Sequence, residues 1–161
     1  MFALRRLALI VPVAVACSLS EQVETPPVDI TTATNPSDVR LGDTAHVSIE
    51  LVNVSDQVVW IGPSGCNNDF MILNNSGQAY RPAETIYCIL ALLPPVELSP
   101  SESYSIEAFT TGRAIAEDSQ EAPGLLAPGT YSIRAVMAVL RGDEDALLVR
   151  SSPSTITFRA N

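Results

Sequence analysis

The sequence predicts an all-β chain folded as an antiparallel β-sandwich. Several short segments alternate apolar and polar residues with a period of two, which is the pattern of half-buried strands. Each segment is bounded by Gly, Pro, Asn, Asp or Ser, and the chain holds 12 prolines. Helical spacing of apolar residues is scarce. Many short strands at this spacing favour two packed sheets.

The clearest strand signal is "DTAHVSIELVNVS", residues 43–55. Its apolar side is expected to face the core and comprises Ala45, Val47, Ile49 and Leu51. His46 falls on the polar side, which predicts a solvated histidine. A tight turn at 53–56 then leads into a second strand, "QVVWIG", at 57–62. Trp60, the only tryptophan, is expected to fill the core against the disulfide predicted below, with a ligand-stacking platform as the alternative.

Further strands follow along the chain. "DFMILNNSGQAYR", residues 69–81, predicts a hairpin that turns through Asn75-Ser76-Gly77. Residues 84–95, "ETIYCILALLPP", are consistent with a buried strand or with a helical turn. Strands are also expected in "SESYSIEAF", "GTYSIRAVMAVL", "LLVRSS" and "STITFRA". Their core-facing residues would be Tyr104, Ile106 and Ala108, then Tyr131, Ile133, Ala135, Met137 and Val139, then Ile156 and Phe158.

Residues 109–129 are predicted to form a long loop between two strands. At about 20 residues this stretch exceeds the usual connection in a compact domain. Loops of this kind on rigid sandwiches often carry binding. The sequence therefore nominates the loop as a partner-binding segment, with Arg113, Ile115, Glu117 and Asp118 as its candidate contacts.

The first 16 residues have the layout of a secretory signal peptide. Arg5 and Arg6 precede an apolar run at 7–16, which is followed by Cys17. That run has 10 residues, and a membrane-spanning helix needs about 20. Ala14 and Ala16 supply the small residues that a signal peptidase requires, so cleavage is expected just before Cys17.

Cys17 at this position resembles the cysteine of a bacterial lipobox, which is acylated before cleavage. Ala14 stands where lipoboxes usually carry Leu, and an ordinary cleavage site would place the same scissile bond. The sequence thus predicts a lipidated Cys17, with simple secretion as the alternative. Residues 17–27 would be the lipidated cysteine and a flexible tether, and 28–161 the folded domain. Ser18 after the cysteine favours the outer membrane in a cell that has one.

Cys66 and Cys88 remain after Cys17 is assigned to a lipid. An even number of cysteines in an oxidising compartment predicts a disulfide between them. A pair of free thiols and a metal site are the alternatives. The sequence contains no CxxC spacing, and its single histidine is isolated from both cysteines.

The charge balance excludes nucleic acid as a partner. The chain carries 9 basic and 18 acidic residues, for a net charge of −9, and loss of Arg5 and Arg6 makes it −11. An acidic surface repels nucleic acid and anionic lipid headgroups. The acidic clusters at 117–121 and 143–145 lack the alternating spacing of a calcium loop and are interpreted as solvated turns.

Four segments of the sequence resemble parts of known protein families. "PSDVRLGDTAHVSIELVNVSDQVVWI" resembles the opening of bacterial envelope domains with an immunoglobulin-like fold. "FMILNNSGQAYR", "VELSPSESYSIEAF" and "LAPGTYSIRAVM" follow in the order found in the BsuPI-type intracellular proteinase inhibitor domain. Ser101 stands where that family has Gly. The resemblance implies an immunoglobulin-like antiparallel β-sandwich, and it suggests proteinase inhibition as an alternative function.

No catalytic constellation is evident in the sequence. It lacks a nucleophile motif, a phosphate loop and a pair of histidine ligands. We therefore expect no enzyme activity, no cofactor and no metal. The sequence predicts a lipid-anchored protein of the bacterial cell envelope that acts as a binding or structural module, with an envelope protein or a protease as its partner.

Overall fold

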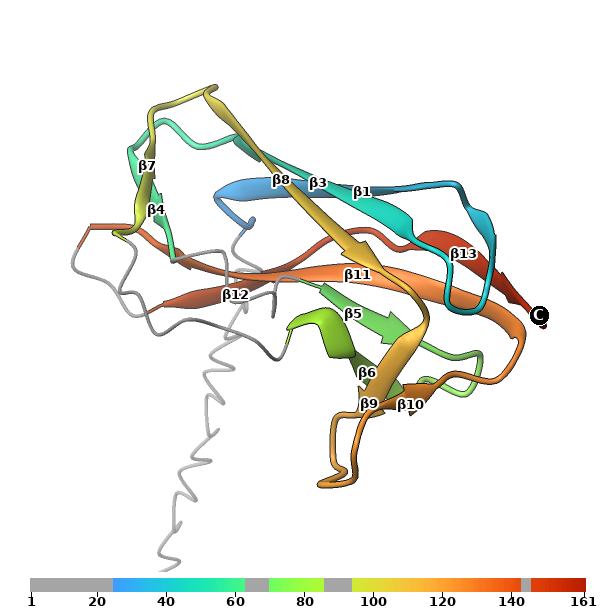
Figure 1. Cartoon of the computed structure of the whole chain (residues 1–161). Helices are drawn as coiled ribbons and strands as arrows, with labels where there is room; N and C mark the ends of the chain where they lie inside the picture. Colours follow the sequence, from blue (N-terminus) through green and yellow to red (C-terminus); the bar gives the residue numbers. More distant parts are fainter. Residues whose placement is uncertain (1–24, 63–69, 86–93, 143–145) are drawn as a thin grey trace, which may run out of the picture.

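The computed structural model describes residues 25–62, 70–85, 94–142 and 146–161, which form two packed β-sheets (Figure 1). The predicted signal peptide, the predicted lipidation site Cys17 and the predicted disulfide partners Cys66 and Cys88 lie outside these residues. Among the described residues, the structure has no helix long and apolar enough to cross a membrane.

The small sheet has three antiparallel strands in the order β1-β3-β8. They are β1 (Val28–Asn35), β3 (Ala45–Asn53) and β8 (Ser103–Thr110). All eight residues of β1 pair with β3, from Val28 opposite Asn53 to Asn35 opposite His46.

The large sheet contains the other strands of the described chain. Its main path is β10 (Gly124–Leu125), β9 (Arg113–Ala116), β6 (Ala79–Pro82), β5 (Phe70–Leu73), β11 (Gly129–Leu140), β13 (Ser154–Arg159) and β2 (Asp38–Arg40). The second half of β11 pairs with β12 (Leu147–Arg150) and with β4 (Val59–Ile61), and β4 pairs with β7 (Val96–Leu98). A 3-10 helix, η1 (Ala83–Thr85), follows β6.

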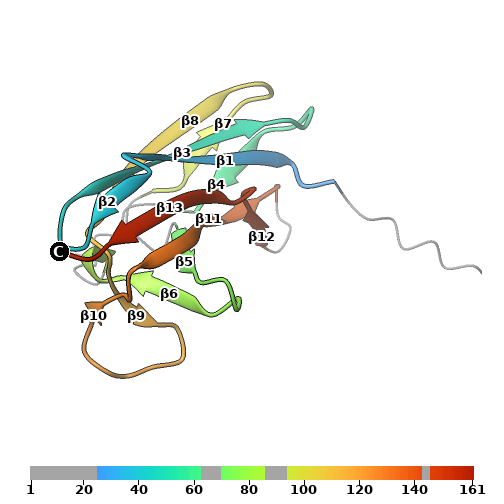
Figure 2. The ribbon, with the colours of Figure 1, turned by 90° about the vertical axis from the view of Figure 1, so that its right-hand side faces the viewer.

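The topology is that of an immunoglobulin-like sandwich. The first strand is divided between the sheets: β1 pairs antiparallel with β3, and after Asn35-Pro36 the chain crosses so that β2 pairs parallel with β13. Figure 2 shows β1 and β2 in succession above β13. The other pairings of the described strands are antiparallel. The predicted all-β fold class is confirmed.

The core lies between the sheets and follows the predicted alternation. The apolar side of β3, from Ala45 to Leu51, is fully buried. Opposite it, β11 buries Tyr131, Ile133, Ala135, Met137 and Val139, and β13 buries Ile156 and Phe158. Burying each large apolar side chain contributes about 1.5–3 kcal/mol, so these strands dominate the stability of the domain.

The prediction for Trp60 is wrong. The strand β4 begins at Val59, and Val59 and Ile61 are its buried residues, while Trp60 is only half-buried on the opposite face. Four consecutive apolar residues at 58–61 leave no alternation from which the inward side could be assigned. Trp60 instead lies beside Leu140 and Glu97 of the neighbouring strands.

The prediction of a loop at 109–129 is also wrong. This stretch contains the end of β8, the strands β9 and β10, and the start of β11. At Gly112 the chain leaves the small sheet with φ of 75°, and it continues into β9, the second strand of the large sheet. Ala114 and Leu126 are buried, which anchors the β9–β10 hairpin to the core.

Candidate binding site

A cavity of about 420 Å³ lies beneath the β9–β10 hairpin. Its walls come from four strands that are distant in sequence. Tyr80 belongs to β6, Ala114 and Ala116 to β9, Leu125 to β10 and Tyr131 to β11. The small alanine side chains leave the space between the two tyrosines and the hairpin open. We call this cavity the tyrosine pocket.

The hairpin is held over the pocket by strand pairing on both sides of β9. Tyr80 of β6 pairs with Ala116, and Gly124 of β10 pairs with Ala114. The amide of Leu126 also donates a hydrogen bond to the carbonyl of Gly112, with 2.8 Å between nitrogen and oxygen. The hairpin wall of the pocket is therefore part of the large sheet.

The two tyrosines are fixed by their hydroxyl groups. Tyr131 donates to the carbonyl oxygen of Ala127 at 2.8 Å, and Tyr80 donates to Oε1 of Gln78 at 2.7 Å. Their rings meet edge to face, with centroids 6.5 Å apart. Burial raises the pKa of the Tyr131 phenol, and the neighbouring Tyr80 raises that pKa further. The Tyr131 phenol thus stays neutral at physiological pH.

The rim of the pocket is polar and carries one carboxylate. Asn74, Ser119 and Glu121 contribute polar groups, and the pocket has no cationic lining residue among those described. Hydrogen bonding inside the chain orders this rim, since Ser119 Oγ accepts from the amide of Glu121 at 3.0 Å. Aromatic walls with a carboxylate and hydroxyls suit a ligand that donates hydrogen bonds or bears a cationic group.

The structure brings only one of the predicted contact residues to the pocket. Ile115 lines it, half-buried. Arg113, two residues before Ile115 on the same face of β9, does not line the pocket; it is exposed, and its guanidinium lies 3.4 Å from the carbonyl oxygen of Pro123. Glu117 and Asp118 are exposed in the turn after β9. Tyr80 and Tyr131 were predicted only as strand residues. They become neighbours through the pairing of strands that are distant in sequence, which no local pattern reveals.

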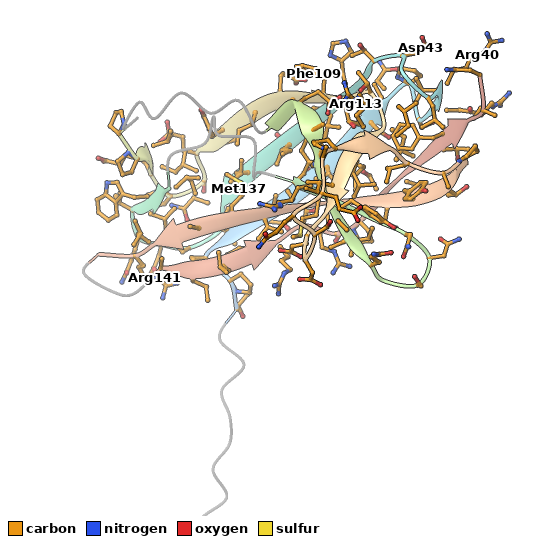
Figure 3. All side chains as sticks on the ribbon, turned by 60° about the horizontal axis from the view of Figure 1, so that its bottom comes forward. Arg40, Asp43, Phe109, Arg113, Met137 and Arg141 are labelled. Carbon is orange, nitrogen blue, oxygen red and sulfur yellow. The ribbon has the colours of Figure 1, made fainter. Side chains whose placement is uncertain are left out.

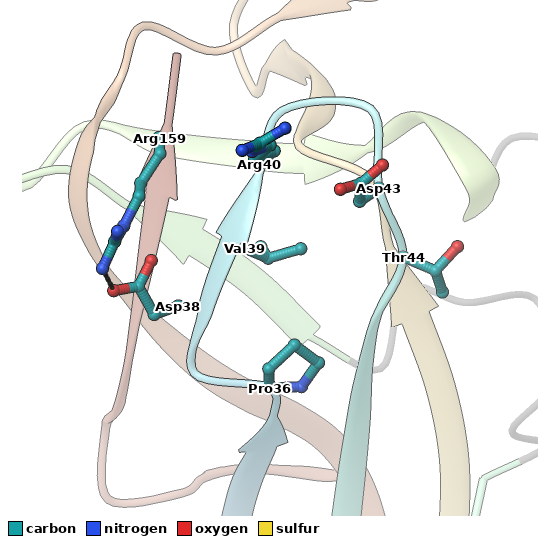
Figure 4. A pocket seen from close by; sticks show the side chains of 7 residues that line it. All are labelled: Pro36, Asp38, Val39, Arg40, Asp43, Thr44 and Arg159. Atoms are coloured by element: carbon teal, nitrogen blue, oxygen red, sulfur yellow. Dashed lines mark hydrogen bonds and ion pairs between the residues drawn. The ribbon is translucent and has the colours of Figure 1, made fainter. Parts of the chain in front are cut away.

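A second and more open cavity, of about 600 Å³, lies between β2 and the start of β3. Figure 4 shows its lining residues, which include Arg40, Asp43 and Thr44. Arg159 forms an ion pair with Asp38 at its edge. The hydrogen bond and the charge of Asp38 raise the pKa of Arg159. The charged residues are exposed and partly neutralise each other, so this cavity is the weaker candidate.

His46 lies exposed on the outer face of the small sheet, between Asn35 and Phe109 of the adjacent strands. Within the described ranges, no side chain forms a hydrogen bond or an ion pair with it, so no base–nucleophile pair is assembled there. The same ranges contain no group of three His, Cys, Asp or Glu residues placed to hold a metal ion.

Comparison with known proteins gives structural similarity alone. No protein-family model matches the chain, and no curated protein matches it. The structure is similar to the alkylpurine DNA glycosylase AlkC of Pseudomonas fluorescens, with 15% identity, a TM-score of 0.43, and coverage of 83% of this chain and 31% of that one. It is also similar to a β-glucosidase of Erythrobacter marinus, with 17% identity, a TM-score of 0.44, and coverage of 82% and 15%.

A third similar structure is the PapD-like domain 7 of human CEP192, with 12% identity, a TM-score of 0.42, and coverage of 93% of this chain and 98% of that domain. The chain spans less than a third of the glycosylase and about a sixth of the glucosidase. With TM-scores below 0.5, none of these similarities bears on the function of the chain.

Proposed function

We propose that this chain is a non-enzymatic lipoprotein of the bacterial cell envelope. Its immunoglobulin-like domain is a module that binds a partner through the tyrosine pocket. Cys17 is the lipid-bearing residue, and residues 18–27 are the tether to the domain. The basic, apolar and small-residue order of residues 5–17 supports export and anchoring.

The observation that carries this proposal is the position of the pocket relative to the tether. β1, which begins at Val28, starts at the upper left of the domain in Figure 1 and at its right in Figure 2, whereas the β9–β10 hairpin lies at the bottom in Figure 1 and at the lower left in Figure 2. The eight residues of β1 alone span about 26 Å at the usual rise of a strand. A domain tethered at Val28 therefore presents the pocket away from its anchor.

The geometry of β9 bears on the alternative of proteinase inhibition. A protease cleft accepts an extended segment whose edges are free. The segment Arg113-Ala114-Ile115 pairs with β6 on one side and with β10 on the other, and Ala114 is buried. This segment cannot enter a cleft without leaving the sheet, so we favour binding through the pocket.

In-cell photo-crosslinking from the pocket tests the proposal. A benzophenone amino acid at Leu125, which lines the pocket and is 54% exposed, should yield a discrete crosslinked species. The matched control is the same group at Val54, which is 57% exposed in the turn after β3. Ala116→Leu, which fills the pocket, should remove the Leu125 crosslink. Equal crosslinking from both positions, or none from Leu125, would refute the pocket as the binding site.

A further inference from the structure

The arginines of the folded domain are segregated onto one face. Seven arginines follow Arg6 in the sequence, and six of them belong to strands. Each of these six arginines is next in sequence to at least one buried residue. Side chains alternate between the two faces of a strand, so each arginine side chain points outward. All six strands belong to the large sheet. The six residues are Arg40, Arg81, Arg113, Arg134, Arg150 and Arg159. We call the outer face of this sheet the arginine face.

The opposite face of the sandwich has the reverse charge. The outward residues of the small sheet include Asp29, Glu50 and Glu107, and its three strands contain no arginine. Packed sheets are about 10 Å apart, and outward side chains add to that separation. The Debye length in physiological salt is about 8 Å. A charged surface that approaches one face is therefore largely screened from the other, and the net charge of −9 describes neither face.

At the centre of the arginine face the cationic residues alternate with apolar ones. Arg134 of β11 pairs with Met71 of β5. Arg81 follows Tyr80, which pairs with Ile72, so Arg81 lies on the other side of Met71. Figure 3 brings the underside of Figure 1 forward and shows Arg40 and Arg141 at opposite ends of the domain, with Arg113 between them.

Two features of this face indicate that it binds a partner. Nε of Arg134 is buried and has no hydrogen-bond partner, which is costly for a guanidinium nitrogen. Leu148 projects from the same face beside Ala138 with 61% of its surface exposed, and Arg150 lies two residues further along β12. Guanidinium groups interspersed with exposed leucine suit a surface of oxyanions over hydrocarbon.

We infer that the arginine face lies against an anionic bilayer and sets the orientation of the domain on the membrane. The inference rests on the proposed lipid tether. β12, which carries Arg150 and Leu148, lies at the same end of the sandwich as Val28, where the tether begins (Figures 1 and 2). A lipid on Cys17 holds this face within reach of headgroups, and a tether turns a weak contact into an effectively intramolecular one.

A bilayer fits the arrangement better than an acidic protein segment does. The arginines are dispersed across strands from β9 to β2, and neighbouring strands are about 4.8 Å apart. An extended peptide lies along a narrow track, so it would meet only part of this set. A plane of phosphates can meet arginines on several strands at once, foremost Arg81, Arg134 and Arg150, whereas Arg113 lies on the hairpin far from the tether and Arg159 is paired with Asp38. The acidic small sheet would then point away from the membrane.

Vesicle sedimentation with the unacylated chain tests the inference. The protein is residues 17–161 with Cys17→Ser, and the vesicles contain phosphatidylglycerol and phosphatidylcholine in equal amounts, or phosphatidylcholine alone. We expect binding only to the anionic vesicles, weakened by salt. Arg81→Gln/Arg134→Gln/Arg150→Gln should lower the partition coefficient by about tenfold or more. Asp29→Asn/Glu50→Gln/Glu107→Gln, the matched triple on the other face, should leave it unchanged or raise it.

Circular dichroism checks the fold of both triples, and Arg81→Glu/Arg150→Glu, which changes only exposed residues, serves as a second variant. Equal binding of the arginine variants and the parent would overturn the inference. So would binding to neutral vesicles, or binding of polyglutamate without binding of vesicles. Because the chain carries no lipid, these results are independent of whether Cys17 is acylated in the cell.

Discussion

The phenol of Tyr131 is hydrogen-bonded to the carbonyl oxygen of Ala127, four residues earlier in the chain, at 2.8 Å. Pro128 and Gly129 form the corner between them, and β11 starts at Gly129. A tyrosine that closes the corner before this strand is a hallmark of immunoglobulin-like domains. The same ring packs on Phe158, with centroids 5.8 Å apart, and forms a wall of the tyrosine pocket. One residue thus joins the fold to the candidate site.

Tyr131→Phe should destabilise the domain by about 1 kcal/mol, because it removes this hydrogen bond and keeps the ring. The expected fall in melting temperature is about 3 °C. Tyr104→Phe is the control, since within the described chain the Tyr104 hydroxyl makes no hydrogen bond. Thermal unfolding of the two variants beside the parent measures the difference. Equal losses in both would show that the corner hydrogen bond contributes nothing.

The raised pKa of Tyr131 predicts a loss of stability at alkaline pH. Its folded-state pKa lies above the unfolded value of 10.0, mainly through burial. Above that unfolded value the unfolded chain releases the phenolic proton first, so unfolding is favoured as pH rises toward the folded pKa. Below it the contribution is fully present. Urea unfolding across this pH range should show a steeper decline in the parent than in Tyr131→Phe; parallel declines would contradict the assignment.

Among the amide side chains of the described residues, Asn53 is predicted to cause the largest loss of stability when it is replaced. Its Nδ2 donates to the carbonyls of Gln57 and Leu98 at 2.8 and 2.9 Å, and its side chain is buried. Asn53→Ala leaves both carbonyls without that donor and should cost about 3 kcal/mol. Asn74 Oδ1 accepts hydrogen bonds from the amide and the hydroxyl of Ser76 near the surface, so Asn74→Ala should cost only about 1 kcal/mol. Chemical denaturation distinguishes these values, and similar costs would refute the role given to burial.

The packing of Gly112, which precedes β9, can be tested with Gly77, in the turn between β5 and β6, as the matched control. Both have positive φ, 75° and 83°. A Cβ at Gly112 would lie 2.8 Å from Leu41 Cδ2 and 3.1 Å from the ring of Phe158, whereas a Cβ at Gly77 meets nothing within 4 Å. Gly77→Ala should cost about 1 kcal/mol from backbone strain, and Gly112→Ala about 3 kcal/mol. If the two variants unfold at the same denaturant concentration, Gly112 is not packed as the structure has it.

Alternation of apolar residues was sufficient to predict the long central strands. From Ala45 to Leu51 in β3 and from Tyr131 to Val139 in β11, every second residue is apolar and buried, so both the strand and its inward face follow from local sequence. The hairpin at Asn75-Ser76-Gly77 was also predicted, and Gly77 has the positive φ that such a turn requires.

Other strands depend on contacts that no local pattern reveals. β1 contains three threonines and was not predicted as a strand, but Thr32 and Thr34 hydrogen-bond to Ser154 and to the Thr155 carbonyl of β13. β9 is four residues long and exists because β6 and β10 pair with it. The tyrosine pocket has the same origin, since Tyr80 and Tyr131 become neighbours only when β5 pairs with both β6 and β11.

The charge on each face was hidden in the sequence for a similar reason. The outward positions of Arg134 and Arg150 follow from the buried residues beside them. Sequence alone does not say that all six strand arginines belong to one sheet. The predicted repulsion of anionic headgroups was argued from net charge, which does not describe how basic and acidic residues are divided between the two faces of the sandwich.

The most direct test of the central claim is the mass of the N-terminal peptide of the protein extracted from bacterial membranes. A tethered binding module requires processing before Cys17 and a diacylglyceryl group on its thiol. We predict an N-terminal peptide that starts at Cys17 and carries the mass of that lipid, and loss of the protein from the membrane fraction with Cys17→Ser. A mature chain that starts elsewhere, or at an unmodified Cys17 in the soluble fraction, would contradict the account.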